Sequence, residues 1–248
     1  MWLRSSLLEE VGFPKHGFTT RAGGVSEGAY ASWNFSTSTG DRADAVEENL
    51  RLLALRLDVQ RKQIRSVTQI HSDRVVLCEE AEQPTADEQA DALLSFVPGL
   101  VVGVKTADCV PLLLAERKSR AVAAIHAGWR GVVSEIAVRV IERLRARVSS
   151  PDLFVAIGPH ISAEVFQVGD EVAAHFAEAA RPDPSTEGRH LVDLRGALVA
   201  QLERAGVPRE QIDHVHGCTV SDTSARFFSH RASSGRCGRM FNFIAGER

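Results

Sequence analysis

Three short apolar segments follow one another between residues 100 and 125, and they constrain the fold more than any other feature of the chain. Residues 100–106, 110–115 and 121–125 are rich in Val, Leu, Ile and Ala, and each segment is too short for a typical helix. A polar stretch at 116–120 supplies a turn before the last of them. The pattern predicts three buried strands in quick succession.

Further strands and helices are expected on both sides of this block. Apolar residues recur at three- and four-residue spacing in the helical segments, which are 44–57, 132–148, 170–180 and 194–205. Short runs of β-branched, aromatic and other apolar residues indicate strands at 16–21, 65–70, 74–77, 153–157, 212–216 and 240–244. Because strands occur in runs as well as alternating with helices, we expect an α+β fold with mixed β-sheets packed with helices. No linker or repeat divides residues 1–248, so a single domain is expected.

Composition excludes several classes of protein. Of the 248 residues, 44% are hydrophobic and 25% are charged, which excludes a disordered chain. A net charge of −3 provides no positive field for nucleic acid or an anionic membrane surface. The most apolar stretch, 93–104, is interrupted by Ser95, Pro98 and two glycines, which excludes a membrane span there. Four dispersed cysteines without a Cys-x-x-Cys pair indicate reduced thiols and a cytoplasmic protein, and no protein partner is predicted.

One segment is strongly acidic. Six acidic residues and no basic one lie between Glu79 and Asp91. Such a run of like charge indicates a solvated loop.

Two histidines and one cysteine each stand where an apolar strand gives way to a turn. His71 follows 65–70, Cys109 precedes 110–115, and His126 follows 121–125. Edges of neighbouring strands can bring such residues together, and two imidazoles with one thiolate form a three-ligand catalytic zinc set. The adjacent Asp108 discourages a free thiolate unless a metal or a histidine offsets its charge. The same residues would also suit a Cys/His hydrolase without metal. A third possibility is that the three residues lie apart in the fold and share no site.

Copper is a weaker hypothesis. His214 and His216 share one face of an expected strand, with Cys218 close behind. A multicopper oxidase needs many more histidine pairs than a chain with nine histidines and two methionines can provide. Zinc is therefore the expected metal, and copper is not.

Two segments could hold an anion. Arg130 stands at the start of an expected helix, just after the glycine turn at Gly128, where backbone N–H groups favour anions. An arginine that simply packs over Trp129 explains this segment equally well. The tail carries basic residues and no acidic one between Asp222 and Glu247, namely Arg226, His230, Arg231, Arg236 and Arg239. Guanidinium groups match phosphate oxygens, so the tail suggests a phosphate clamp, although a solvated basic face explains it equally well. Aromatic residues make up only 6%, which argues against a stacking surface for single-stranded nucleic acid.

Together these segments resemble one bacterial family. It was once described as multicopper polyphenol oxidases or laccase-like proteins, and later as purine nucleoside phosphorylases. The matching segments run in order from residue 16 to the end of the chain. They include His-Gly-Phe-Thr-Thr-Arg at 16–21, Ser-Trp-Asn-Phe at 32–35, Gln-Ile-His at 69–71, Ala-Asp-Cys-Val-Pro at 107–111, His-Ala-Gly-Trp-Arg-Gly at 126–131, Ile-Gly-Pro at 157–159 and Phe-Phe-Ser-His-Arg at 227–231.

The resemblance implies a fold and a metal. The fold would be the α+β sandwich shared with Cys/His hydrolases, and the metal would be zinc on His71, Cys109 and His126. Those three residues would also be catalytic. Beyond the ligands, our own hypothesis is that Asp108 serves as a proton shuttle or as a partner of the zinc ligands.

The resemblance also implies substrates. They would be phosphate and the purine nucleosides adenosine, inosine and methylthioadenosine, cleaved to base and ribose 1-phosphate, with deamination of adenosine as a second activity. For these substrates, our own hypothesis is that Arg130, or Arg231 and Arg236 of the tail, hold phosphate, and that Asn34 lines the sugar site. Within the same family, the alternative is a peptidoglycan-editing amidase that removes L-serine from a UDP-muramic acid precursor.

Overall fold

The three apolar segments near residue 110 become strands of two different sheets. In the computed structural model, which describes residues 1–80, 85–176 and 178–246, β6 (Val101–Thr106) joins a five-stranded sheet of order β1-β2-β14-β6-β3. β7 (Val110–Glu116) and β8 (Val122–Ala127) join a six-stranded sheet of order β13-β9-β7-β8-β5-β4. A small antiparallel sheet has the order β10-β12-β11. The short link between β6 and β7 therefore carries Cys109 from one large sheet to the other.

The remaining strands complete these three sheets. Both large sheets are mixed. In the five-stranded sheet β3 is parallel to β6, and in the six-stranded sheet β13 is parallel to β9 and β4 is parallel to β5. The other strands are β1 (Trp2–Leu3), β2 (His16–Thr19), β3 (Ile64–Arg65), β4 (Val75–Cys78), β5 (Ala92–Ser95), β9 (Leu153–Ile157), β10 (Gln167–Val168), β11 (Ala180–Pro182), β12 (His190–Val192), β13 (Ile212–His214) and β14 (Met240–Ala245). The α-helices are α1 (Ser6–Glu10), α2 (Ala43–Leu57), α3 (Trp129–Val133), α4 (Ile136–Arg145), α5 (Asp170–Ala173) and α6 (Leu194–Arg204).

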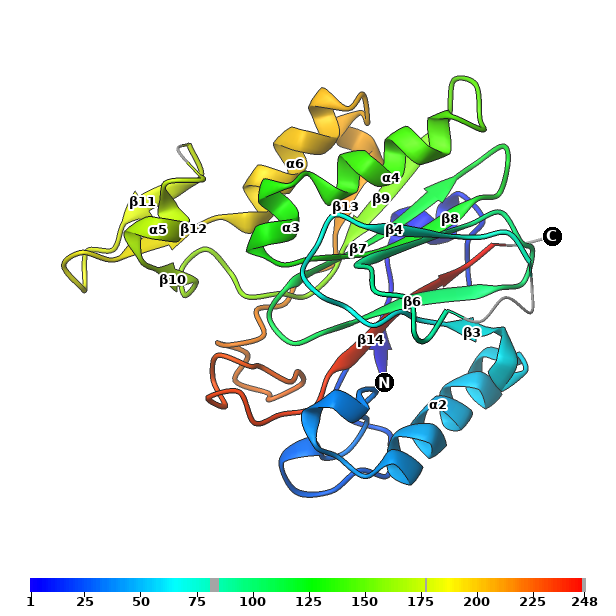
Figure 1. Cartoon of the computed structure of the whole chain (residues 1–248), viewed down its shortest axis with the longest axis horizontal. Coiled ribbons are helices and arrows are strands. Elements are labelled where there is room, and N and C mark those ends of the chain that lie inside the picture. Colours follow the sequence, from blue (N-terminus) through cyan, green and yellow to red (C-terminus); the bar gives the residue numbers. More distant parts are fainter. Residues whose placement is uncertain (81–84, 177, 247–248) are drawn as a thin grey trace.

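The two large sheets stack face to face between helices, as Figure 1 shows. Side chains of a strand alternate between its two faces, and β7 follows this rule. Leu113 and Ala115 pack toward the five-stranded sheet, whereas Leu112 and Leu114 pack toward α4 and α6. On the opposite side of the molecule, α2 covers the five-stranded sheet. The expected α+β fold with mixed sheets packed with helices is confirmed.

Two expected helices differ from the structure. The predicted helix 132–148 is two helices, α3 and α4, because Glu135 between them adopts a left-handed conformation with φ of 57°. The predicted helix 170–180 ends at Ala173, and 180–182 forms β11 instead. Pairing of β11 with β12 outweighs the local helical preference, which is weak in so short a segment.

The expected strand at 65–70 is also shorter than predicted. Only Ile64–Arg65 pairs with β6, and the chain then leaves the sheet in a loop that reaches His71. β5 was not expected, since the acidic stretch before it indicated only a loop. Residues 81–84 of that stretch lie outside the described part of the chain. Among the described residues, no helix combines the length and the apolar character needed to cross a bilayer.

Candidate metal centre and cavity

His71, Cys109 and His126 meet at one point, as the zinc hypothesis requires. One nitrogen of each imidazole and the sulfur of Cys109 all lie within 4.8 Å of one another. The Cys109 Sγ is 3.8 Å from His71 Nε2, and the two imidazole rings meet edge to face with centroids 4.9 Å apart. The residues come from the loop after β3, the β6–β7 link and the end of β8, so both large sheets contribute. This donor set fits zinc, which binds imidazole nitrogen and thiolate sulfur.

Asp91 holds this cluster together, and the expectation of a solvated loop is wrong at this residue. Its side chain is fully buried, and its Oδ1 lies 2.8 Å from His126 Nδ1. The same carboxylate accepts hydrogen bonds from the backbone N–H groups of Ile70, His71 and Ser72. A carboxylate behind a ligating histidine fixes the ring and raises its basicity, which is a common arrangement at metal sites. Asp91 therefore positions both histidines.

The charges in the cluster favour a thiolate. Burial by itself would raise the pKa of Cys109, but the neighbouring imidazoles outweigh burial and lower this pKa to about 6. Burial likewise opposes the charged form of His126, but the Cys109 thiolate and Asp91 outweigh it and raise the pKa to about 9. For Asp91 too, burial is outweighed by hydrogen bonds from His126 and Ser72, which lower the pKa to about 2. The site thus supplies an ionised sulfur near neutral pH, as metal binding requires.

Gly128 leaves room for the ligands. A Cβ atom at this position would lie 2.8 Å from His71 Cδ2 and 3.1 Å from Cys109 Sγ. Its backbone φ of −71° would suit any residue, so space rather than conformation requires glycine here.

The cluster opens into a cavity of about 450 Å³, within the size range of sites for small-molecule ligands. Lys105, Arg231 and Arg239 give the wall positive charge, His230 adds an imidazole, and Asp108 contributes a carboxylate. The remaining lining residues are Ser36, Thr37, Ser38, Thr68, Gln69, His71, Thr106, Ala107, Cys109, His126, Ile161 and Phe166.

The structure separates the residues expected to bind substrate. Arg231 and Asp108 line the cavity, whereas Arg130, Arg236 and Asn34 do not. Arg130 lies exposed with its guanidinium 4.2 Å above the Trp129 ring, and Arg236 is exposed in the tail.

Asp108 ties down the tail. Its two carboxylate oxygens accept hydrogen bonds from the Thr219 hydroxyl and from the Arg231 backbone N–H, both at 2.6 Å. The side chain therefore fixes the wall of the cavity that carries Arg231. This placement fits a partner of the site, the second of the two roles expected for Asp108.

Asn34 is fully buried, and its amide joins two neighbouring segments. Its Nδ2 donates to the Ser36 carbonyl and to the Asp41 carboxylate. Its Oδ1 accepts from the backbone N–H of Ser36 and of Arg239. The side chain thus organises a loop and an arginine that both line the cavity.

Lys105 and Asp91 are two residues of this site that sequence reasoning did not select. The only signal for Lys105 was a charge near the end of an otherwise apolar strand. Asp91 carried no local signal, because the described acids before it are exposed and have the same composition signal.

The second histidine group does not form a metal site. The rings of His214 and His216 lie edge to face with centroids 4.2 Å apart. Arg195 donates a hydrogen bond to His214 Nδ1, so this nitrogen is not available to a metal. Within the described ranges, only His71, Cys109 and His126 bring three possible ligand atoms together. The structure therefore offers no copper cluster at 214–218.

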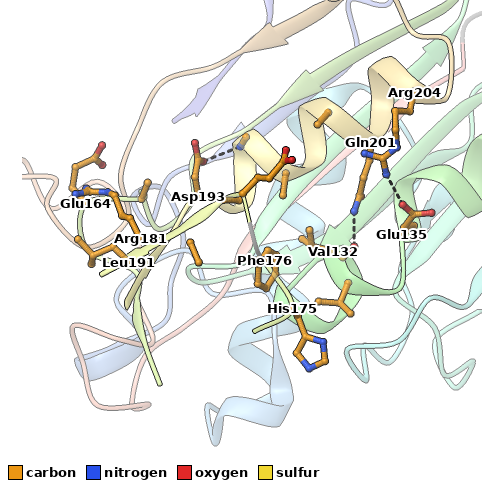
Figure 2. Close-up of a pocket in the computed structure, with 18 residues that line it drawn as sticks. Val132, Glu135, Glu164, His175, Phe176, Arg181, Leu191, Asp193, Gln201 and Arg204 are labelled. Carbon is orange, nitrogen blue, oxygen red and sulfur yellow. Dashed lines mark hydrogen bonds and ion pairs between the residues drawn. The ribbon is translucent and has the colours of Figure 1, made fainter. Parts of the chain in front are cut away.

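A larger cavity, of about 740 Å³, lies between α3, α6 and the small sheet. Figure 2 shows that several of its polar side chains bind protein groups: Arg204 pairs with Glu135, and the Gln201 amide donates to the Val132 carbonyl. It includes none of the three clustered ligands. The smaller cavity is therefore the better candidate for catalysis, because it holds the reactive groups.

Comparison with known proteins identifies the family. The profile of the family described as multi-copper polyphenol oxidoreductase laccase matches residues 15–247. The chain belongs to this family. The structure of YlmD from Geobacillus stearothermophilus superposes with a TM-score of 0.87 at 29% identity, covering 100% of this chain and 96% of that one.

Relatives within this laccase-like family have been named for nucleoside enzymes. A protein of Deinococcus radiodurans named purine nucleoside phosphorylase is 38% identical, over 94% of this chain and 89% of its own. A protein from an unknown prokaryotic organism, named adenosine deaminase RL5, is 36% identical over 96% of this chain and 98% of its own. These names agree with the substrates that the resemblance implied.

Proposed function

We propose that this protein is a cytoplasmic, zinc-dependent purine nucleoside phosphorylase, which also deaminates adenosine. The observation that carries the proposal is the His71–Cys109–His126 cluster at a cationic cavity of about 450 Å³. The names of the relatives support the choice of substrate. Inosine, adenosine and methylthioadenosine are the proposed nucleosides, and phosphate is the second substrate.

Phosphorolysis requires two ligands in one pocket. The bond between C1′ and the purine nitrogen breaks with its electron pair leaving on the base, and a phosphate oxygen forms the new bond to C1′. The base takes up a proton as it leaves. Cationic side chains of the cavity wall hold the phosphate oxygens and concentrate the anion beside the sugar. Of the arginines expected to do this, Arg231 is kept in the proposal because it lines the cavity.

The metal would be held by His71, Cys109 and His126. When bound there, zinc supplies a Lewis acid beside the substrate. Asp91 keeps the His126 ring oriented through its Nδ1, and Asp108, which also accepts from the Thr219 hydroxyl, keeps Arg231 in the wall. A Cys/His thiol mechanism would use the same residues without metal, and the two mechanisms differ in their response to chelators.

The test combines two substrates with one pair of variants. Purified protein with inosine and phosphate is expected to release hypoxanthine and ribose 1-phosphate only when phosphate is present, and with adenosine to release ammonia. His71→Ala should abolish both activities, whereas His190→Ala, a surface residue paired with Asp170, should abolish neither. Chelator treatment should remove activity and zinc should restore it. Absence of phosphorolysis, together with cleavage of a seryl-muramoyl nucleotide, would establish the amidase function instead.

A further inference from the structure

Among the described residues that line the cavity, Lys105 is the one cation whose side chain makes no ion pair or hydrogen bond. It stands on β6 directly opposite Phe241 of β14, so the two side chains share one face of the five-stranded sheet. The other side chain of β6 on that face, Val101, packs in an apolar cluster with Phe241. An ammonium group at the end of such a row costs free energy unless a negative partner offsets it.

No such partner is present in the part of the chain that the structure describes. The side chain of Lys105 makes no ion pair there, and burial alone lowers the pKa of its ammonium group. The hydrogen bonds of Lys105 to Gln69 are made by its backbone. Its carbonyl accepts from Gln69 Nε2 and its N–H donates to Gln69 Oε1, each at 2.7 Å. Gln69 lies two residues before His71, so these bonds also fix Lys105 relative to the metal ligands.

The other cations of the wall are already engaged. Arg231 donates to the Gln167 carbonyl at 3.0 Å and lies over the Phe166 ring. Arg239 donates to the carbonyls of Cys237 and Gly238. These bonds fix both guanidinium groups in the wall, where their charges still attract an anion. The three N–H donors of Lys105 make no hydrogen bond to the described residues and are available to a ligand.

Hydroxyl groups line the same cavity. Thr37 and Ser38 line it on a loop that Asn34 holds, and Asn34 also accepts a hydrogen bond from the Arg239 backbone N–H at 2.8 Å. The Phe35 N–H donates to the Arg239 carbonyl, so loop and arginine form one rigid wall. An ammonium group, hydroxyls and a guanidinium that line one cavity suit a tetrahedral oxyanion.

We propose that Lys105, with the hydroxyls of Thr37 and Ser38 and the guanidinium of Arg239, forms the phosphate-binding subsite of this cavity. Lys105 supplies the main charge, and Arg239 and the loop orient the oxygens. The use of bound phosphate in catalysis rests on the proposed phosphorylase function. The binding of phosphate does not, and it can be measured separately.

The first experiment measures binding of inorganic phosphate to the zinc-loaded protein by calorimetry, without nucleoside. Lys105→Met should weaken binding by about tenfold or more, because it removes a charged donor from a half-buried site. Lys105→Arg, which keeps the charge, should recover most of the affinity. Lys118→Met, on an exposed turn, is the matched control and should bind like the unmodified protein. Equal affinities for Lys105→Met and the unmodified protein would overturn the proposal.

The second experiment measures phosphorolysis of inosine. Lys105→Met should raise the KM for phosphate by about tenfold or more, while the KM for inosine changes much less. Equal loss in the Met and Arg variants would indicate a structural role and overturn the proposal. The proposal would also be overturned if Lys105→Met bound UDP more weakly but bound phosphate as well as the unmodified protein does, since Lys105 would then serve a nucleotide substrate. If the unmodified protein binds phosphate through Lys105 but cleaves no nucleoside, the subsite stands and the phosphorylase function fails.

Discussion

Asp91 and His126 form a buried pair in which the carboxylate Oδ1 lies 2.8 Å from the imidazole Nδ1. The pairing follows from sheet register: Ala92 of β5 lies opposite Ile125 of β8, which places Asp91 beside His126. The ring thereby turns its other nitrogen toward Cys109 and His71, and this orientation underlies the first prediction.

Asp91→Asn should weaken zinc binding by about 10- to 100-fold, because the amide keeps the size of the carboxylate but loses its charge. The measurement is competition with a chromophoric chelator. Asp87→Asn changes an exposed acid of the same segment and should leave the affinity unchanged. Equal affinities in the two variants would mean that Asp91 does not support the metal ligands.

Cys109 should be reactive in metal-free protein near neutral pH. With a pKa of about 6, its thiolate is present above that pH and is lost as the pH falls below it. Alkylation by iodoacetamide should therefore reach half of its maximal rate near pH 6. Cys78, whose pKa burial raises to about 11, serves as an internal control and should stay unmodified. The experiment uses a Cys218→Ser background and peptide mapping, and a midpoint above pH 8 would contradict the prediction.

Gly128→Ala should displace the ligands without harming the backbone. The added methyl group would approach His71 Cδ2 to 2.8 Å, so that ring must move. Displacement of about 1 Å at a catalytic site can cost about 100-fold in rate, and a loss of that order is expected in nucleoside cleavage. Gly131→Ala, whose nearest contact would be an ordinary 3.4 Å to Ile136, is the control and should keep near-normal activity.

Asn34→Ala should lower the free energy of unfolding by about 2–4 kcal/mol, because it leaves the N–H groups of Ser36 and Arg239 without their acceptor. Urea denaturation measures this change. Since the same residue positions the loop at 36–38, the KM for phosphate should also rise. A stable variant with unchanged kinetics would show that Asn34 organises nothing in the cavity.

Local pattern was enough to predict most elements and to select the three residues that cluster in space. β9 spans 153–157 as expected, and α2 and α6 differ from their predicted bounds by one residue. His71, Cys109 and His126 could be selected because each stands at a strand end, where side chains of neighbouring strands can meet.

Asp91 and Lys105 could not be selected in this way. Asp91 belongs to an acidic segment whose composition indicates solvent, and only pairing of β5 with β8 buries it. Lys105 stands on an apolar strand, β6. Because β6 belongs to the five-stranded sheet, the Lys105 side chain lies in the cavity wall.

The sequence by itself determined which residues could bind a metal and which segments are helical or extended, because these depend on side-chain chemistry and on spacing along the chain. The tertiary structure alone decided which of the charged residues face the cavity. That choice depends on register and on sheet stacking between strands far apart in sequence, and no local pattern records either of them.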